Sequence, residues 1–223
     1  MDAPHLEPAG CVDVDCMSTA LATYLDALPQ GLDSYPEFRL KGSIFRQFID
    51  ALDVETLLPA LPTPLQRWVR RPPPDNAWMP EVHSNAIFVV AAQVCFASEA
   101  AFVEFAYDAN SRALQTPLYH GLIRFLSPQR VVRLAASTWG LMHAGSSLAV
   151  HDDGHSVELE MQHPAFAYPR LMLSALATGY AAAAHLAGEE DTVVRLSCSQ
   201  EGEARFHLDW RGRPLRGQAS HAG

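Results

Sequence analysis

The chain has 223 residues, 48% of them hydrophobic, which suffices for a substantial core in one domain or one domain with an extension. Its formal net charge is −9 at pH 7, which argues against a nucleic-acid partner, because such proteins usually carry a basic surface. No apolar run reaches the roughly 18 residues that a membrane span needs, and the first residues lack the pattern of a secretory signal. We therefore expect a cytoplasmic protein without a membrane span and with reduced thiols.

The first part of the chain reads as an extension of the folded body. Residues 1–37 are expected to be partly disordered, with one short helix that begins at Ser18. A single domain is predicted over residues 38–211, and residues 212–223 are expected to form a flexible tail.

Helical signals dominate residues 38–144, which we interpret as a helical part of the domain. Short apolar segments at helical spacing follow residues that favour helix N-termini, and residues 86–96 read as a buried helix. The candidate N-caps are Ser43, Asp53, Thr63, Ser98, Thr116 and Ser127.

The hydrophobic period changes to two after residue 145, which indicates strands with one buried face. Apolar and polar residues alternate over 148–151 and again over 157–162, and the Asp153-Gly154 dipeptide between them favours a two-residue hairpin turn. Such a turn would pair Val150 with Val157 and place His151 on the outer face.

A helix and two further strands complete the predicted sheet part, residues 145–211. Pro169 opens a helix that Gly188 can end, and a three-residue connection containing Gly202 joins the last two strands. The fold class is therefore α+β, with an N-terminal helical subdomain followed by β-β-α-β-β and a four-stranded antiparallel sheet. The residues expected to pack against the helix are Val157, Leu159, Phe206, Leu208 and Trp210.

The segment HDDGHSVELEMQH, residues 151–163, raises the question of a metal site. A metal ion needs three or four converging ligands, and His151, His155 and His207 could meet only if the outer edges of both hairpins were adjacent. We interpret the segment as a hairpin with an acidic, solvated outer face and predict no metal ligands.

Catalytic signatures are weak. The segment HAGSSLAV is not a Gly-x-Ser-x-Gly elbow, and Lys41 is the single lysine, which removes most Schiff-base and phosphate-loop mechanisms. We predict no catalytic residues and a binding protein rather than an enzyme, with an enzyme of unrecognised site as an alternative.

Several segments over residues 40–211 carry a resemblance. The chain resembles an uncharacterised paralogous family expanded in myxobacteria. The resemblance is carried by LKGSIFRQFIDAL, LP near Leu61, WMP at Trp78–Pro80, SPQRVVRLAASTW and the β-β-α-β-β end. The C-terminal layout also looks like that of haem–nitric-oxide sensor domains and 4-vinyl-reductase-type ligand-binding domains. The resemblance implies a non-catalytic sensory or regulatory domain.

Haem is the cofactor that this resemblance raises. His120 and His143 lie before the predicted sheet, where a haem sensor keeps its proximal histidine. Haem–nitric-oxide domains carry a Tyr-x-Ser-x-Arg clamp, whereas the matching stretch here reads LEMQHP (Leu159–Pro164). No cofactor is therefore predicted, and a haem- or metal-dependent sensor is the alternative.

The expected partner is a small apolar ligand or a protein. An apolar pocket between the helical part and the sheet would use aromatic walls and two polar tips, although the same residues could form an ordinary core. The candidate pocket residues are Phe102, Phe105, Tyr119, Trp139 and His143. The outer sheet face is a second candidate surface, with Glu158, Glu160, Arg195, His207 and Asp209.

Overall fold

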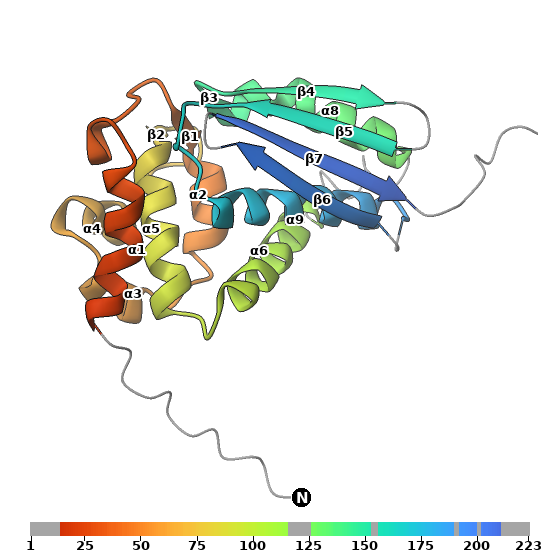
Figure 1. Cartoon of the computed structure of the whole chain (residues 1–223). Coiled ribbons are helices and arrows are strands. Elements are labelled where there is room, and N and C mark those ends of the chain that lie inside the picture. Colours follow the sequence, from red (N-terminus) through yellow and green to blue (C-terminus); the bar gives the residue numbers. More distant parts are fainter. Residues whose placement is uncertain (1–13, 116–125, 153–155, 190–191, 200–201, 211–223) are drawn as a thin grey trace, which may run out of the picture.

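The computed structural model describes residues 14–115, 126–152, 156–189, 192–199 and 202–210. Most helices of the first half gather at one end of the molecule, and a four-stranded sheet with two helices against it lies at the other (Figure 1). The first half contains α1 (Val14–Asp26), a 3-10 turn η1 (Gly31–Asp33), β1 (Arg39–Lys41), α2 (Gly42–Ile49), α3 (Val54–Ala60), α4 (Thr63–Arg70), β2 (Trp78–Pro80), α5 (Glu81–Val94) and α6 (Glu99–Leu114). The second half contains α8 (Pro128–Met142), β3 (His143–Ala144), β4 (Ser147–Asp152), β5 (Ser156–Gln162), α9 (Arg170–Leu186), β6 (Thr192–Ser199) and β7 (Glu203–Trp210).

The larger sheet has the strand order β4-β5-β7-β6, and every neighbouring pair is antiparallel. Helix α9 packs against β6 and β7, and α8 packs against β4 and against α9. The Tyr180 ring of α9 meets the Phe206 ring of β7 edge-on, with 5.1 Å between centroids. The predicted α+β class and the antiparallel sheet crossed by a helix are confirmed.

The register of the first hairpin differs from the prediction. Val150 lies opposite Leu159 and Asp152 lies opposite Val157, so the predicted Val150–Val157 pair at a two-residue turn is wrong by two residues. The turn residues 153–155 lie outside the described residues. Because the shift is an even number of residues, the apolar positions still share the inner face.

The second hairpin has the predicted three-residue connection, because Ser199 lies opposite Glu203. Gly202 in this connection has a φ of +103°, in the left-handed region that favours glycine. A Cβ added there would lie 2.3 Å from the carbonyl oxygen of His163, so this position also needs glycine for close backbone approach.

A small second sheet, with order β2-β1-β3, was not predicted. Its strands have two or three residues each, too few to show an alternation of apolar and polar positions. Leu40 of β1 lies opposite Met79 on one side and opposite His143 on the other. The sheet thereby joins three segments that are far apart in the sequence and fixes where α5 begins.

The predicted helix caps are confirmed at three helices. The Asp53 side chain accepts from the backbone N–H groups of Glu55 and Thr56, and Ser98 and Ser127 cap α6 and α8 in the same way. Thr63 is not the N-cap that was predicted, because α4 begins at Thr63 itself and Pro62 holds the N-cap position.

Helix α2 also starts earlier than its predicted cap, Ser43, because it begins at Gly42. A Cβ at Gly42 would meet the carbonyl oxygen of Pro74 at 2.1 Å, so the helix start depends on this glycine.

The core begins earlier in the chain than the predicted boundary at residue 38. Leu21, Tyr24 and Leu28 are buried members of the main core cluster, which places α1 and the turn after it in the folded body.

The inner sheet residues behave as predicted. Four of the predicted inner residues are fully buried, namely Val157, Leu159, Phe206 and Leu208. The side chain of the fifth, Trp210, is not among those that the structure describes. Within the described ranges no helix is both long enough and apolar enough to cross a membrane.

Candidate functional site

A buried carboxylate stands where β2 passes into α5. Glu81 is the first residue of α5, and its side chain is 3% exposed. His143 of β3 lies beside it, with Nδ1 at 2.9 Å from Oε1 and 3.2 Å from Oε2. The hydroxyl of Tyr168 donates to Oε1 of the same carboxylate. Two donors and the positive end of α5 therefore offset the cost of burying this charge.

His143 is fixed from several sides. The pairing of β1 with β3 sets its backbone, and the Trp139 ring stacks on the imidazole at a centroid distance of 3.8 Å and an interplanar angle of 7°. The indole of Trp139 is in turn held by its N–H, which donates to Ser146 Oγ at 3.0 Å. The imidazole therefore has little freedom to turn away from Glu81.

Tyr168 connects this network to the adjacent chain segment, residues 163–169, between β5 and α9. Burial raises the pKa of Tyr168 well above its ordinary value, and the negative charge of Glu81 raises it further. The phenol therefore stays protonated and can donate to the carboxylate.

The same segment is attached to the helical part by its carbonyl groups. Tyr24 and Asn85 both donate to the carbonyl oxygen of Ala167, at 2.8 and 2.9 Å. Tyr35 donates to the carbonyl oxygen of Ala165 at 2.9 Å. These bonds hold residues 163–169 between the helices and the sheet.

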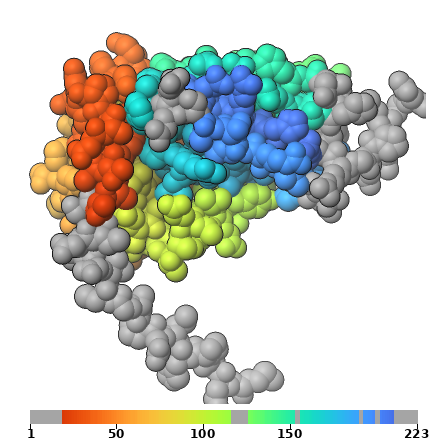
Figure 2. All heavy atoms as spheres, in the orientation of Figure 1, coloured from red at the N-terminus to blue at the C-terminus, as the bar shows by residue number. Residues whose placement is uncertain are grey.

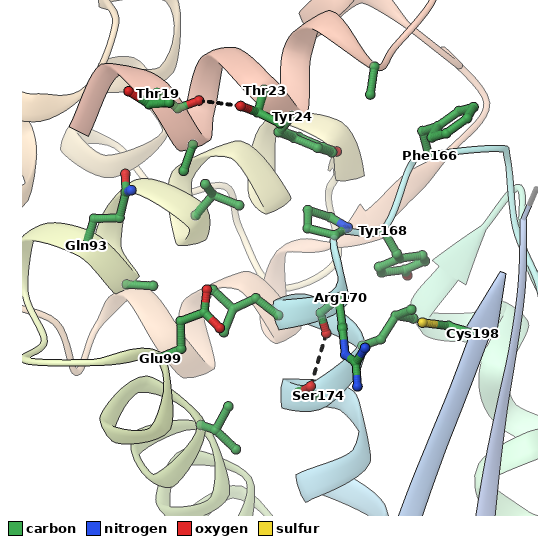
Figure 3. A pocket seen from close by; sticks show the side chains of 18 of the residues that line it. Thr19, Thr23, Tyr24, Gln93, Glu99, Phe166, Tyr168, Arg170, Ser174 and Cys198 are labelled. Carbon is green, nitrogen blue, oxygen red and sulfur yellow. Dashed lines mark hydrogen bonds between the residues drawn. The ribbon is translucent and has the colours of Figure 1, made fainter. Parts of the chain in front are cut away.

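A cavity of about 1030 Å³, widely open to solvent, lies beside this segment. Its wall is formed by α1, the end of α5, the start of α6, residues 163–174 and Cys198 of β6. The space-filling view shows α1 (red), α6 (yellow-green) and the sheet part (teal and blue) meeting on this face (Figure 2). In the close view, Gln93 and Glu99 lie on one side of the cavity and Arg170 and Cys198 on the other (Figure 3).

Most of the cavity wall is apolar, with a few polar groups. Gln93 and His163 line the cavity, and each has one inaccessible side-chain atom, Oε1 and Nε2 respectively, without a hydrogen-bond partner among the described residues. Glu99 and Arg170 are exposed at the cavity and carry opposite charges. An apolar wall with a few polar groups is typical of sites for small molecules.

The predicted pocket residues that the structure describes do not form this wall. Phe102 is fully buried and packs with Phe105 and Phe96 in an aromatic cluster, while Trp139 and His143 belong to the Glu81 network. Tyr119 lies outside the described residues. None of the four described residues lines the cavity, and their role in ligand binding stays a prediction.

Tyr24, Gln93 and His163 line the cavity but were not predicted as site residues. Tyr24 fell in the segment predicted to be an extension, and Gln93 fell in a helix interpreted as entirely buried. His163 follows the predicted strand and precedes the helix that Pro169 opens. A polar residue at such a junction often belongs to a binding site, and this position was the one clue to His163 in the sequence.

The outer sheet face carries the predicted charged residues, and three of them pair with one another. Arg195 and Asp209 form an ion pair at 2.7 Å, and His207 lies 3.0 Å from the same carboxylate. His151 is exposed and lies 3.5 Å from Glu160. Among the residues that the structure describes, no three His, Cys, Asp or Glu side chains converge as a metal site.

Comparison with known proteins does not assign a family. A scan against family models finds no match, and a search of curated proteins finds no significant one. A search of solved structures finds a chain from work described as "Probing the function of heme distortion in the H-NOX family", with a TM-score of 0.49 and 10% identity. The match covers 80% of this chain and 97% of that chain. A similarity at this level carries no argument about function, and membership in the myxobacterial family stays a prediction.

Proposed function

We propose that this chain is a sensory or regulatory domain that binds a small, mainly apolar molecule in the cavity between α1, α5, α6 and the start of α9. The observation that carries the proposal is the cavity itself, whose volume of about 1030 Å³ is ample for a small molecule. It lies at the junction of the helical part and the sheet part, where ligand sites commonly form.

The arrangement of titratable groups favours binding over catalysis. Glu81 and His143 are buried and bonded to each other, and neither lines the cavity. Tyr168 does line it, but its hydroxyl is bonded to Glu81. These three groups are thus engaged in holding the cavity wall together.

A cavity-filling substitution tests the proposal. The neutral fluorophore N-phenyl-1-naphthylamine should bind the purified chain with a rise in its fluorescence. Ala100→Trp, at the exposed end of the cavity, should weaken this binding, because the indole occupies part of the space. Ala51→Trp, at an exposed position that does not line the cavity, is the matched control and should bind as the unmodified chain does. Equal binding by the two variants, or none by the unmodified chain, contradicts the proposal.

Haem is the alternative ligand for a sensor of this kind. His143 does not line the cavity and its ring face is covered by Trp139, so it does not fit the role of an axial ligand in this cavity. His120 lies outside the described residues. A visible absorption spectrum of the purified protein tests this alternative. A Soret band would show bound haem and would contradict the proposal of a small apolar ligand.

A further inference from the structure

Arg170 supplies a positive charge to the cavity wall. Among the described residues that line the cavity, Glu99 is the one carboxylate and Arg170 the one guanidinium, and no lysine is present. Glu99 stands at the start of α6 and Arg170 at the start of α9, on different sides of the cavity (Figure 3). A ligand in the cavity can therefore meet one cationic side chain and one anionic side chain separately.

The Arg170 guanidinium has no counter-ion within the described ranges. Two other exposed arginines do have one, because Arg133 pairs with Asp152 at 2.8 Å and Arg195 pairs with Asp209 at 2.7 Å. No described carboxylate forms such a pair with Arg170. Its N–H donors are therefore available to a bound molecule.

The helix dipoles make the two charges unequal. Arg170 is the first residue of α9, whose first turn contains no acidic residue. The N-terminus of a helix carries a partial positive charge, so the dipole of α9 adds to the charge of Arg170. Glu99 is the first residue of α6, where the dipole instead offsets its negative charge. The uncompensated charge at the cavity is therefore positive, and it lies at Arg170.

We propose that the molecule bound in this cavity is a single-chain carboxylate amphiphile, of the fatty-acid class, and that its carboxylate pairs with the guanidinium of Arg170. The planar guanidinium matches a carboxylate through two parallel N–H···O bonds. Arg170 is exposed and the cavity is open, so the carboxylate keeps part of its hydration while the hydrocarbon chain is buried. The apolar wall that takes the chain includes Ala20, Val89, Ala92, Val103, Leu171 and Leu173.

This inference rests on the proposed function, because it names the ligand class of the same cavity. Two probes of equal size and different charge test it. Undecanoate is ionised at neutral pH, as carboxyl groups are, whereas dodecan-1-ol has the same number of heavy atoms and no charge. Each is titrated, below its micellar concentration, against the chain loaded with N-phenyl-1-naphthylamine, and its affinity is taken from the loss of fluorescence.

Removal of the guanidinium should affect one probe only. Arg170→Gln should weaken the binding of undecanoate about threefold, the size expected for an ion pair at an exposed site, and leave dodecan-1-ol unchanged. Added sodium chloride should reduce this difference, because salt screens an exposed ion pair. Urea denaturation should show that Arg170→Gln is no less stable than the unmodified chain, since the change removes a cation from a helix N-terminus.

Arg112→Gln is the matched control. Arg112 is exposed on α6 and does not line the cavity, so its replacement removes the same charge from the chain at a distance from the ligand. The affinity of both probes should stay as in the unmodified chain.

The outcomes separate the two proposals. If undecanoate does not displace the fluorophore, or binds Arg170→Gln as tightly as it binds Arg112→Gln, the inference is overturned and the cavity is left as a site for neutral apolar molecules. Equal weakening of the carboxylate and the alcohol by Arg170→Gln also overturns it, because Arg170 would then act through the shape of the cavity. Failure of the fluorophore and both probes to bind overturns the proposed function and the inference with it.

Discussion

Tyr168 lines the cavity and also donates its hydroxyl to the buried carboxylate of Glu81. One side chain therefore belongs both to the proposed ligand site and to the network that joins α5 to β3 through His143. The ring and the hydroxyl can be tested separately, because phenylalanine keeps the ring and removes the hydroxyl.

Tyr168→Phe should lower the free energy of unfolding by about 1–3 kcal/mol, because Glu81 loses one of its two side-chain donors while it stays buried. Binding of N-phenyl-1-naphthylamine should change little, since the cavity wall keeps its ring. Urea denaturation measures the first quantity and fluorescence titration the second.

The matched control for this hydroxyl is Tyr107→Phe. The Tyr107 hydroxyl contacts His185 at an exposed site, so its removal should cost less than about 0.5 kcal/mol. Equal losses in the two variants would mean that the bond to Glu81 contributes no more than a surface contact.

The inner face of the sheet supports a second prediction. Leu159 and Phe206 lie opposite each other on β5 and β7, and both are fully buried. Leu159→Ala and Phe206→Ala should each cost about 2–5 kcal/mol in urea denaturation. Val193→Ala, at a site on β6 that is 42% exposed, should cost less than about 0.5 kcal/mol. Small losses at the two inner positions would contradict the core assignment.

The sheet was predictable because its pattern is periodic. Alternation over residues 157–162 and 204–208 needs no tertiary information, and the two faces survive even a register error of two residues. The turn at 153–154 was the weaker part of the prediction, because a dipeptide that favours a tight turn does not require one. The small sheet carried no such signal, since three residues of β1 cannot show a period.

The cavity was not predictable for a different reason. Its wall combines Tyr24, Gln93 and His163, which lie in three segments far apart in the sequence, and no local pattern links them. Aromatic residues at helical spacing pointed instead to Phe102 and Phe105, whose spacing fits a packed core equally well. Which apolar residues leave a space between them depends on tertiary packing, and composition does not carry that information.

The third prediction concerns acid. Burial is the main cause that lowers the pKa of both His83 and His163 from the ordinary value of 6.5. The positive charge of Arg67 lowers the pKa of His83 further. The unfolded chain therefore binds more protons than the folded chain below about pH 6.5, and protons favour unfolding there.

Stability should stay flat for these groups above pH 6.5 and fall as the pH drops through the range between 6.5 and the lower folded-state pKa values. Urea midpoints at a series of pH values measure the effect. His83→Asn should make the fall shallower, because one of the two groups is removed while the asparagine oxygen can still accept from the Trp68 indole N–H. Stability that rises on acidification through this range would contradict the assignment.

The last prediction uses two glycines with similar backbones and different surroundings. Gly188 has a φ of +95° and Gly202 a φ of +103°, so alanine at either position is strained. An added Cβ meets nothing within 4 Å at Gly188, whereas at Gly202 it would lie 2.3 Å from the His163 carbonyl oxygen. Gly188→Ala should cost about 1 kcal/mol, and Gly202→Ala should cost about 2 kcal/mol or more, because backbone atoms must also move. Since Gly202 accepts the His163 N–H and His163 lines the cavity, that movement should also weaken the binding of N-phenyl-1-naphthylamine, while Gly188→Ala should leave the binding intact. Equal losses of stability, with the binding of the fluorophore unchanged in both variants, would show that the β6–β7 connection does not position His163.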